Sequence, residues 1–440
     1  MELALVLLVL LTPILVVPAR AQYAGPAILS RGEAPAAMAA PQVDFRPFIE
    51  LGGVYDTGLA GVAVNAQGQP PDDSAEGASV IWGISGSHSW RHTTVGLDYR
   101  GSLTRYSLKT YDYIDQSLLL GVTHQITRHI TVKLRQSAGI VNHDFGPLGL
   151  RQSVPFDPST ADVPITDYFD NRTLYLTSQA DLQYQRTARL SFDFGGDGYI
   201  IRRSSTALYG TTGISARGDA QYRLNRRSTI GAQYNFEHFF YPGLIGSADA
   251  QGAAATYAIR FSRSAEFSAY AGFLQVNSTF ERSVPVDPVI AALLGISSAP
   301  EIVHNIYYTP NMAGRLSRTF HNGVSYVSGG RSLSPGNGLF LTSTITTFMA
   351  GYTYTGLRRW SMGVQGGYDT ARAIGTVTGN YNDNFENATL SREISHAVHF
   401  VMSYSSRQYR SPQYQNYNRI INEARISIGY SPGDIPLRVW

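Results

Sequence analysis

Charged side chains recur at alternate positions along several stretches of this 440-residue chain. Lys133 and Arg135 alternate with apolar residues, and Arg217, Asp219 and Arg223 lie in a similar alternation. A guanidinium group binds carboxylates and phosphates through two parallel hydrogen bonds and attracts anionic solutes. A row of such charges can filter solutes that pass along it. Alternatively, its members pair with one another and only hydrate and stiffen the wall that carries them, and the sequence leaves both readings open.

The candidate pore-lining residues share one face of the alternating segments. On this face basic residues slightly outnumber acidic ones, which predicts a mild preference for anions that fades as salt screens the charges. The same face also carries Asp193, Glu237, Arg407 and Glu423. The residues that we expect to line a pore are Asp98, Arg100, Lys133, Arg135, Asp181, Arg217, Asp219, Arg223, Arg260, Asp369, Arg372 and Arg425.

The segments that carry these charges have the two-residue period of β-strands. In His129–Arg135, Ile130, Val132 and Leu134 share one face, and Leu174–Gln185 and Ile214–Leu224 repeat the pattern. These segments exceed the ~5–6 residues usual in soluble sheets and suit tilted strands that cross a membrane. We therefore expect lipid contact for Ile130, Val132, Leu134, Leu182, Ala216 and Ile230.

Short basic or polar turns join the strands in pairs, and longer connections near His143–Asp170 and Glu281–His304 separate the pairs. With an opening strand at Arg46–Thr57 and a closing one at Ile421–Ser431, the pattern predicts an all-β, antiparallel up-and-down transmembrane barrel of about 18 strands, or 16. A soluble propeller or sandwich is the alternative, although it would not segregate its loops in this way. The expected turns are Trp90–His92, Thr127–His129, Gln185–Thr187, Asn225–Arg227, Ser262–Ser264, Ser317–Thr319, Leu357–Arg359 and Ile394–His396.

Aromatic residues gather at both ends of the expected strands, as two membrane-interface belts require. At the tight-turn ends they are Trp90, Tyr184, Tyr222, Phe261, Phe320 and Trp360. At the long-loop ends they are Tyr106, Tyr168, Phe169, Phe239, Phe240, Tyr241, Tyr307 and Tyr308.

In its hairpin rhythm, its aromatic belts and its last residue, Trp440, the stretch Arg46–Trp440 resembles bacterial outer-membrane β-barrel proteins of the porin type. The resemblance implies short periplasmic turns, long extracellular loops and contact with outer-membrane lipid. Trp440 resembles the C-terminal signal read by the barrel-assembly machinery, which would act during biogenesis. Because Pro432, Gly433 and Pro436 interrupt the approach to Trp440, we expect the last strand to end near Ser431.

The two ends of the chain differ from its alternating part. The apolar run Ala4–Val17 and the small residues around Arg20 predict a cleaved signal peptide over 1–21. The Ala/Pro-rich segment 22–45 reads as a periplasmic leader. The barrel is expected over 46–431, and 432–440 is expected to be a periplasmic tail.

Composition narrows the class of function. Only 15% of residues are charged and the net charge is +3, so the sequence offers no basic stripe for nucleic acid. With no cysteine, the chain has no disulfides, thiol catalysis or cysteine-bound metal.

Enzymatic and metal sites are weakly marked. His143-Asp144, His238 and His304 lie near the long-loop rim without a nucleophile at a suitable spacing. The segment Tyr381–Asn384 is similar to calcium-binding loops, although short acidic turns are common. We therefore expect no enzyme, cofactor or metal.

Two long connections are candidates to narrow a pore. Pro285–Ile296 reads as a short apolar helix, capped by Asp287 with Pro288 in its first position. It either folds into the barrel mouth or packs on neighbouring loops. The proline-rich stretch His143–Asp170 is the other candidate.

The sequence thus predicts an outer-membrane pore for passive or semi-selective diffusion of small hydrophilic solutes, since a barrel of this size leaves an open lumen. The alternative is a non-conducting barrel that docks a secretion or polysaccharide-export apparatus or acts in adhesion. Either is compatible with a homo-oligomer.

Overall fold

The computed structural model describes residues 45–59, 74–142, 172–205, 208–243, 246–285, 298–336, 338, 341–354, 356–374, 379–412, 415 and 418–432. The expected signal peptide, nearly all of the leader, the C-terminal Trp440 and the stretch His143–Asp170 lie outside these residues. So does nearly all of the expected helix Pro285–Ile296.

Eighteen strands account for most of the described chain, and a 3-10 turn, η3 (Lys109–Tyr111), precedes the fourth. In the part of the chain that the structure describes, no helix has the length and apolar character needed to cross a membrane. The strands are β1 (Arg46–Asp56), β2 (Ala75–Ser89), β3 (Thr93–Tyr106), β4 (Tyr113–Thr127), β5 (Ile130–Val141), β6 (Thr173–Gln185), β7 (Leu190–Arg203), β8 (Thr211–Arg223), β9 (Ser228–Phe240), β10 (Gly246–Arg260), β11 (Ala265–Pro285), β12 (Ser298–Phe320), β13 (Gly323–Ser334), β14 (Ser343–Tyr354), β15 (Trp360–Ala373), β16 (Asn380–Ser395), β17 (Val398–Arg410) and β18 (Arg419–Tyr430).

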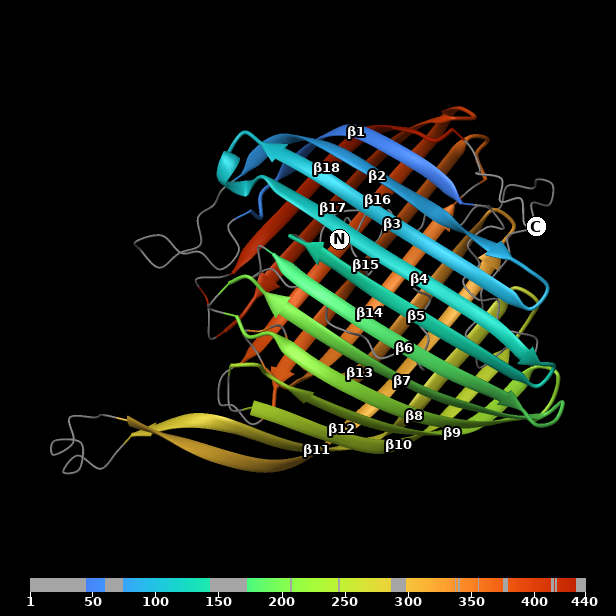
Figure 1. The fold of residues 1–440 in the computed structure, drawn as a ribbon, viewed down its shortest axis with the longest axis vertical. Coiled ribbons are helices and arrows are strands. Elements are labelled where there is room, and N and C mark those ends of the chain that lie inside the picture. Colours follow the sequence, from blue (N-terminus) through green and yellow to red (C-terminus); the bar gives the residue numbers. More distant parts are fainter. Residues whose placement is uncertain are drawn as a thin grey trace, which may run out of the picture.

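The sheet closes on itself. Each strand pairs antiparallel with its neighbours in sequence, and β1 pairs with β18 from Ile49 opposite Tyr430 to Asp56 opposite Glu423. Closure leaves no sheet edge along most of the wall, which satisfies the backbone hydrogen bonds in a membrane. The predicted antiparallel barrel of about 18 strands, porin-like in architecture, is confirmed (Figure 1).

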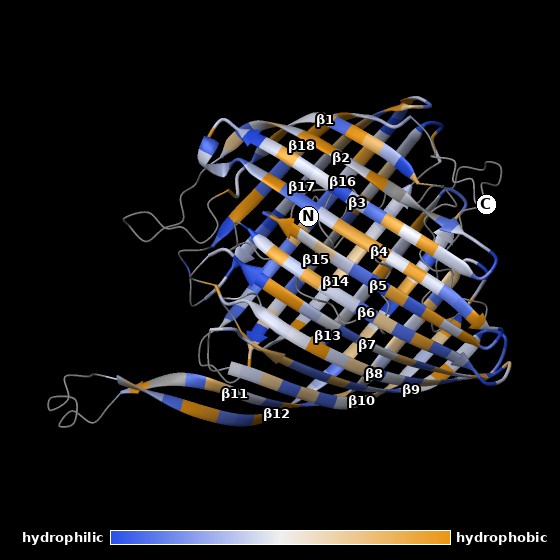
Figure 2. Ribbon diagram, viewed as in Figure 1, coloured by the Kyte–Doolittle hydropathy of each residue, from blue (hydrophilic) through white to orange (hydrophobic). Residues whose placement is uncertain are grey.

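Apolar and polar residues alternate along the strands, so apolar and polar bands succeed one another along the ribbons (Figure 2). Large apolar side chains on this outer face are strongly exposed, among them Leu134 at 50%, Ile214 at 56% and Val364 at 60%. Their neighbours Lys133, Arg135 and Arg217 point the other way. In water such an exposed apolar surface would be unstable, whereas lipid covers it at no cost.

The aromatic residues of the tight-turn end fit the expected belt, since Tyr184, Tyr222 and Phe320 belong to the outer face and are exposed. The long-loop end differs. Phe240 and Tyr308 face outward, but Tyr106, Phe239 and Tyr241 are at most 6% exposed and are enclosed within the barrel. Assigning all of them to a membrane belt was therefore wrong, because neighbouring residues of a strand point to opposite faces.

One expected turn is misplaced. β12 continues through Ser317–Thr319 to Phe320, which lies opposite Gly323, so the connection consists of His321 and Asn322. The basic residue that suggested the turn, Arg318, belongs to the strand, and its guanidinium carbon lies 5.0 Å from the centre of the Phe320 ring.

Much of the stretch Glu281–His304, expected to be a loop, is paired strand. β11 has 21 residues and β12 has 23, and they remain in register to Pro285 opposite Ser298. β12 pairs with β13 only from Met312 onward. The two strands therefore extend beyond the barrel as a hairpin, at the lower left of Figure 1.

Candidate functional site: the barrel lumen

The strand register arranges inward-facing side chains in rows around the lumen. One row runs from Lys133 on β5 through Asp181 on β6, Gly195 on β7 and Arg217 on β8 to Asn235 on β9. Charged and amide side chains from several strands thus meet at one level of the barrel, although they are far apart in sequence. Each strand alternates inward and outward residues, and antiparallel pairing places the inward residues of neighbouring strands side by side in such a row.

Arg217 forms the densest ion-pair network of this row. One of its terminal guanidinium nitrogens contacts Asp181 Oδ1, and its Nε lies 3.8 Å from Asp219 Oδ2. The pair with Asp181 passes over β7, where a Cβ added to Gly195 would come within 2.8 Å of Arg217 Cζ. Glycine at 195 therefore makes the contact between β6 and β8 possible. The side chains of Arg217 and Asp181 are only 8% and 12% exposed.

A second network lies on β15–β17, away from the first. Asp369 on β15 is directly opposite Asp383 on β16. Arg407 on β17 donates from Nε to Asp383 Oδ2 at 2.7 Å and also contacts that oxygen through a terminal nitrogen. A guanidinium paired with one of two facing carboxylates offsets part of the repulsion between them.

The stretch Tyr381–Asn384, which is similar in sequence to calcium-binding loops, lies inside β16, and its Asp383 pairs with Arg407. Among the described residues, no group of three His, Cys, Asp or Glu side chains could hold a metal ion.

The sequence analysis missed several other carboxylates on the inner face. Asp56 on β1 accepts from the Gly58 amide at 2.7 Å and from the Tyr106 hydroxyl at 3.5 Å. Asp115 on β4 accepts from the Asn142 amide at 2.8 Å and from its side chain at 2.7 Å. Asp197, Glu266 and Asp383 lie on the same inner face. The two-residue period of each strand could have identified them, because each lies an even number of positions from an inward residue of the same strand.

Most of the predicted pore-lining residues are brought to the inner face, but Arg372 is not. Arg372 lies an even number of positions from Val364 and Tyr368, which are exposed on the outer face, whereas Asp369 points inward. Two residues three positions apart in a continuous strand cannot share a face. The inner face holds Asp98, Arg100, Lys133, Arg135, Asp181, Arg217, Asp219, Arg223, Arg260, Asp369 and Arg425.

Adding these acids and removing Arg372 turns the basic excess that the sequence suggested into an acidic one, although several of the acids are buried. Asp219, Asp369 and Asp383 are at most 6% exposed. In the pair Arg260–Glu266 the arginine side chain is 33% exposed and the glutamate 6%, at an N–O distance of 2.6 Å. The longer arginine extends further from the wall, as its flexible stem allows. At this pair a solute would therefore meet more guanidinium than carboxylate.

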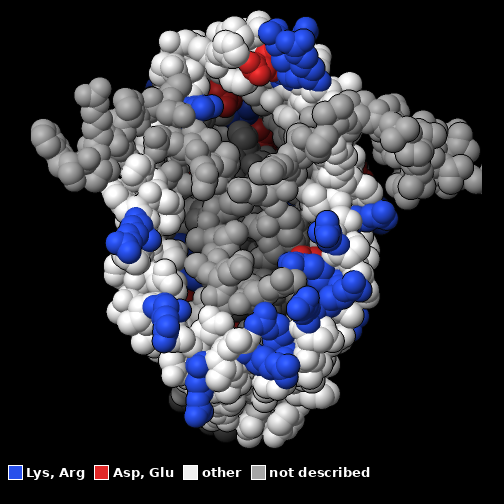
Figure 3. Space-filling view, turned by 90° about the vertical axis from the view of Figure 1, so that its right-hand side faces the viewer, with Lys and Arg blue, Asp and Glu red and all other residues white. Residues whose placement is uncertain are grey.

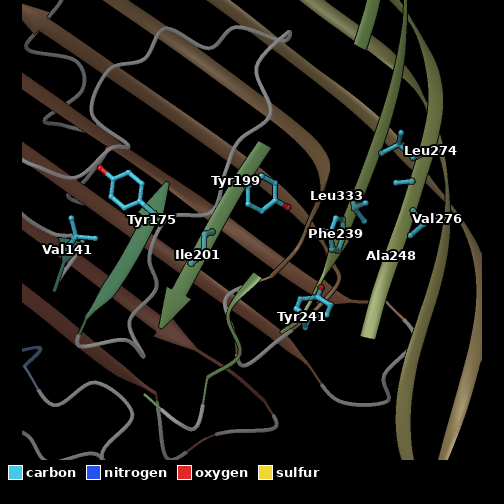
Figure 4. Close-up of a cluster of buried hydrophobic side chains, with 11 residues drawn as sticks. Val141, Tyr175, Tyr199, Ile201, Phe239, Tyr241, Ala248, Leu274, Val276 and Leu333 are labelled. Carbon is cyan, nitrogen blue, oxygen red and sulfur yellow. The ribbon is translucent and has the colours of Figure 1, made fainter. Parts of the chain in front are cut away.

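Near the long-loop end, the inner face of the same strands becomes apolar (Figure 4). Side chains from β5, β6, β7, β9, β10, β11 and β13 form one cluster there, with Tyr175, Phe239 and Val276 no more than 1% exposed. The rings of Phe239 and Tyr241 meet edge to face, with centres 6.1 Å apart. The cluster consists of Val141, Tyr175, Tyr199, Ile201, Phe239, Tyr241, Ala248, Ala250, Leu274, Val276 and Leu333, and Tyr307, Leu341 and Ile374 pack against it.

The connection between β13 and β14 reaches this cluster from another part of the wall. The Tyr241 hydroxyl donates to the Pro335 carbonyl at 3.0 Å and lies 2.9 Å from the Thr342 hydroxyl. Burial raises the pKa of Tyr241, which keeps its hydroxyl protonated as a donor. We call the described residues 335, 336, 338, 341 and 342 the crossing segment.

A glycine allows the crossing segment to come close to β7 and β8. The Tyr209 amide donates to the Gly338 carbonyl at 3.1 Å. Gly338 has a φ of 88°, and an added Cβ would lie 2.7 Å from Arg203 Nε. The crossing segment therefore contacts the connections that follow β7 and β9, four or more strands away. The two candidates that the sequence offered for a constriction, His143–Asp170 and Pro285–Ile296, lie outside the described residues or nearly so.

The rim histidines that the structure describes lie on the outer face. His238 Nδ1 is 2.6 Å from Asp249 Oδ1, and His304 Nδ1 is 2.9 Å from the Thr279 hydroxyl. Both pairs join neighbouring strands and point away from the lumen, so they act as cross-strand contacts.

No family model matches the chain, and no curated protein matches it. Solved structures with a similar fold include Pseudomonas aeruginosa OccK2 (OpdF) in complex with glucuronate, with a TM-score of 0.43 and 10% identity over 89% of this chain and 98% of that one. P. aeruginosa OccK5 (OpdH) has a TM-score of 0.39 and 13% identity over 88% and 98%. P. aeruginosa OpdK with vanillate has a TM-score of 0.39 and 10% identity over 88% and 98%. At these identities the likeness concerns the fold, and we infer function from this chain's own residues.

Proposed function

We propose that the protein is an outer-membrane pore for passive or semi-selective diffusion of small hydrophilic solutes. One observation carries the proposal: a closed barrel of 18 strands has an apolar outer face and an inner face lined with ion pairs. Lipid suits the first face and water the second. A barrel of this size leaves a lumen wider than its wall side chains can fill.

The tight turns and the ends of the strand-forming region lie on one side of the barrel, which supports a periplasmic location for that side. In this arrangement the signal peptide 1–21 directs export, and 22–45 and 432–440 lie in the periplasm. The barrel-assembly machinery inserts the chain into outer-membrane lipid, and the fold is compatible with a homo-oligomer.

The lining favours anions mildly. The inward residues listed above from Asp98 to Arg425 act as the pore lining, and Arg260, more exposed than its partner Glu266, gives the water-filled path a weakly positive surface at its level. The buried ion pairs around Arg217 and Arg407 stiffen the wall and contribute little net field. Exposed charges of the rows therefore filter solutes, whereas the buried ion pairs stiffen the wall.

Conductance in planar bilayers tests the proposal. The purified protein should produce stepwise currents, and a salt gradient should give a reversal potential on the anion side at low ionic strength. Absence of current across repeated insertions of folded protein would contradict the pore and favour a barrel that docks an export apparatus or acts in adhesion.

A further inference from the structure

The tight-turn end of the barrel carries positive charge that the pore does not use. Every connection between paired strands at this end holds Arg or His, and none holds Asp or Glu. Their arginines are exposed: Arg91, Arg128, Arg186, Arg189, Arg226, Arg227, Arg263, Arg358 and Arg359. We call them the basic ring.

Figure 3 views the barrel from the tight-turn end, where blue side chains are distributed around the rim and few red ones are visible. The long-loop end has a different balance of acidic and basic residues. The connection 143–172 carries Asp144, Asp157, Asp162, Asp167 and Asp170, with Arg151 and Arg172 as its basic residues. At the long-loop end of β3, Arg105 is paired with Asp112 at 2.7 Å, and this pair lowers the pKa of Asp112. Among the connections between strands, a net positive charge is thus found only at the tight-turn end.

Exposed aromatic side chains lie next to the basic ring. Trp90 precedes Arg91, Phe261 lies two residues before Arg263, and Trp360 follows Arg359. Trp90 is 40% exposed and Phe261 55%. Aromatic side chains at strand ends occupy the headgroup layer of a membrane. The neighbouring guanidiniums consequently lie at the depth of the lipid phosphates.

Two arginines on the strands extend the ring over the outer face. Arg392 on β16 lies opposite Trp360, with its Cζ 5.0 Å from the ring centre, and Arg318 lies in the same way over Phe320. Cation–π contact holds each guanidinium against an outward-facing ring, beside the lipid and away from the pore mouth. This placement favours a lipid over a soluble acidic protein as the partner.

We propose that the basic ring, with Arg318 and Arg392, binds the phosphates of anionic phospholipids in the periplasmic leaflet. Guanidinium groups bind phosphate oxygens through paired hydrogen bonds, and each near-surface arginine raises the relative affinity for an anionic surface about fivefold. The assignment of the leaflet rests on the proposed outer-membrane orientation. The preference for anionic lipid rests only on the residues of this end.

Trp360 can report which lipids surround the ring. A W82F/W90F/W440F variant keeps it as the single tryptophan, and the folded barrel is placed in phosphatidylcholine vesicles. Phosphatidylglycerol or phosphatidylcholine, brominated on the acyl chain near the headgroup, is then added at equal mole fraction. The ratio of quenching by the two lipids measures the preference within each sample.

We expect the anionic lipid to quench more strongly at low salt, and 1 M salt to reduce the difference. R318Q/R358Q/R392Q should lower the relative affinity for phosphatidylglycerol at least fivefold, and free glycerol phosphate at millimolar concentration should not compete. The control R202Q/R410Q removes two exposed arginines at the long-loop end and should leave the ratio unchanged. Gel mobility before and after heating checks that each variant is folded.

Equal quenching by both lipids in the parent barrel would overturn the proposal. Equal quenching together with binding of a polyglutamate peptide in neutral detergent would assign the ring to a soluble acidic partner, which also overturns it. Because the measurement uses symmetric vesicles and no current, its failure would leave the proposed pore standing.

Discussion

Along β6 to β9 the inner face changes character between the middle of the barrel and the long-loop end. In the middle, Asp181 and Arg217 form an ion-paired row. Toward the long loops, Tyr175 and Phe239 on the same strands are buried in an apolar cluster. The difference separates two tasks: the charged row faces the solute path, whereas the apolar cluster holds the crossing segment in place. One alternating pattern thus provides a lining at one level and a small core at another.

Truncation in the apolar cluster should have the largest effect on stability. Phe239→Ala removes a ring that is 1% exposed, and such a cavity should cost about 3–5 kcal/mol of unfolding free energy. Urea unfolding of the barrel in lipid vesicles measures it. The control is Phe240→Ala, because this neighbour is 42% exposed on the outer face and leaves no cavity. Equal losses for the two variants would mean that the cluster is not a core.

An added charge on the outer face should lower the free energy of unfolding slightly less than the loss of the Phe239 ring. Leu134 is 50% exposed on β5, and Leu134→Arg should lower the unfolding free energy by about 2–4 kcal/mol if it lies near the bilayer midplane. Gln183→Arg on the inner face of β6 should cost far less, because its side chain reaches the water-filled lumen. The same unfolding assay compares them. Similar penalties would reverse the assignment of the two faces.

The strands and the two faces could be predicted because they depend on local alternation and on short turns. The errors have local causes as well. Arg372 was grouped with Asp369 without regard to parity, and Arg318 was taken for a turn residue although it lies over Phe320 within β12. The length of β11 and β12 was missed because proline and acidic residues near Pro285 indicated a loop.

The remaining features depend on contacts that no local pattern encodes. Tyr241 and Pro335 are 94 positions apart, and only the closed barrel brings them together. Asp383 and Arg407 meet because the register of β16 and β17 places them diagonally. The sequence therefore offered only the longest loops as candidates to narrow the pore and gave no sign of the contacts that the shorter connection between β13 and β14 makes.

Loosening the crossing segment should lower the free energy of unfolding less than the two changes above. It should also change the single-channel current measurably. Tyr241→Phe removes the hydroxyl that donates to the Pro335 carbonyl, a loss of about 0.5–1.5 kcal/mol. We expect a higher and noisier single-channel conductance, because the segment is freer to leave the lumen. Tyr257→Phe, an exposed outer-face tyrosine, is the control. Unchanged conductance in Tyr241→Phe would show that the segment does not limit the current.

The smallest expected effects concern ion selectivity, and they separate the exposed charges of the lining from the buried ones. In the pair Arg260–Glu266 the guanidinium is 33% exposed and the carboxylate 6%. Arg260→Gln removes the charge that a solute meets and leaves the buried carboxylate uncompensated, so the preference for anions should fall. Glu266→Gln leaves the guanidinium without its partner, so the preference should rise. Both shifts should shrink toward 1 M salt, where the Debye length is about 3 Å. Reversal potentials in a tenfold salt gradient measure them, with gel mobility confirming that both variants fold. If both substitutions moved the reversal potential in the same direction, the field in the lumen would come from other charges, and the greater exposure of the arginine would not determine what the pore prefers.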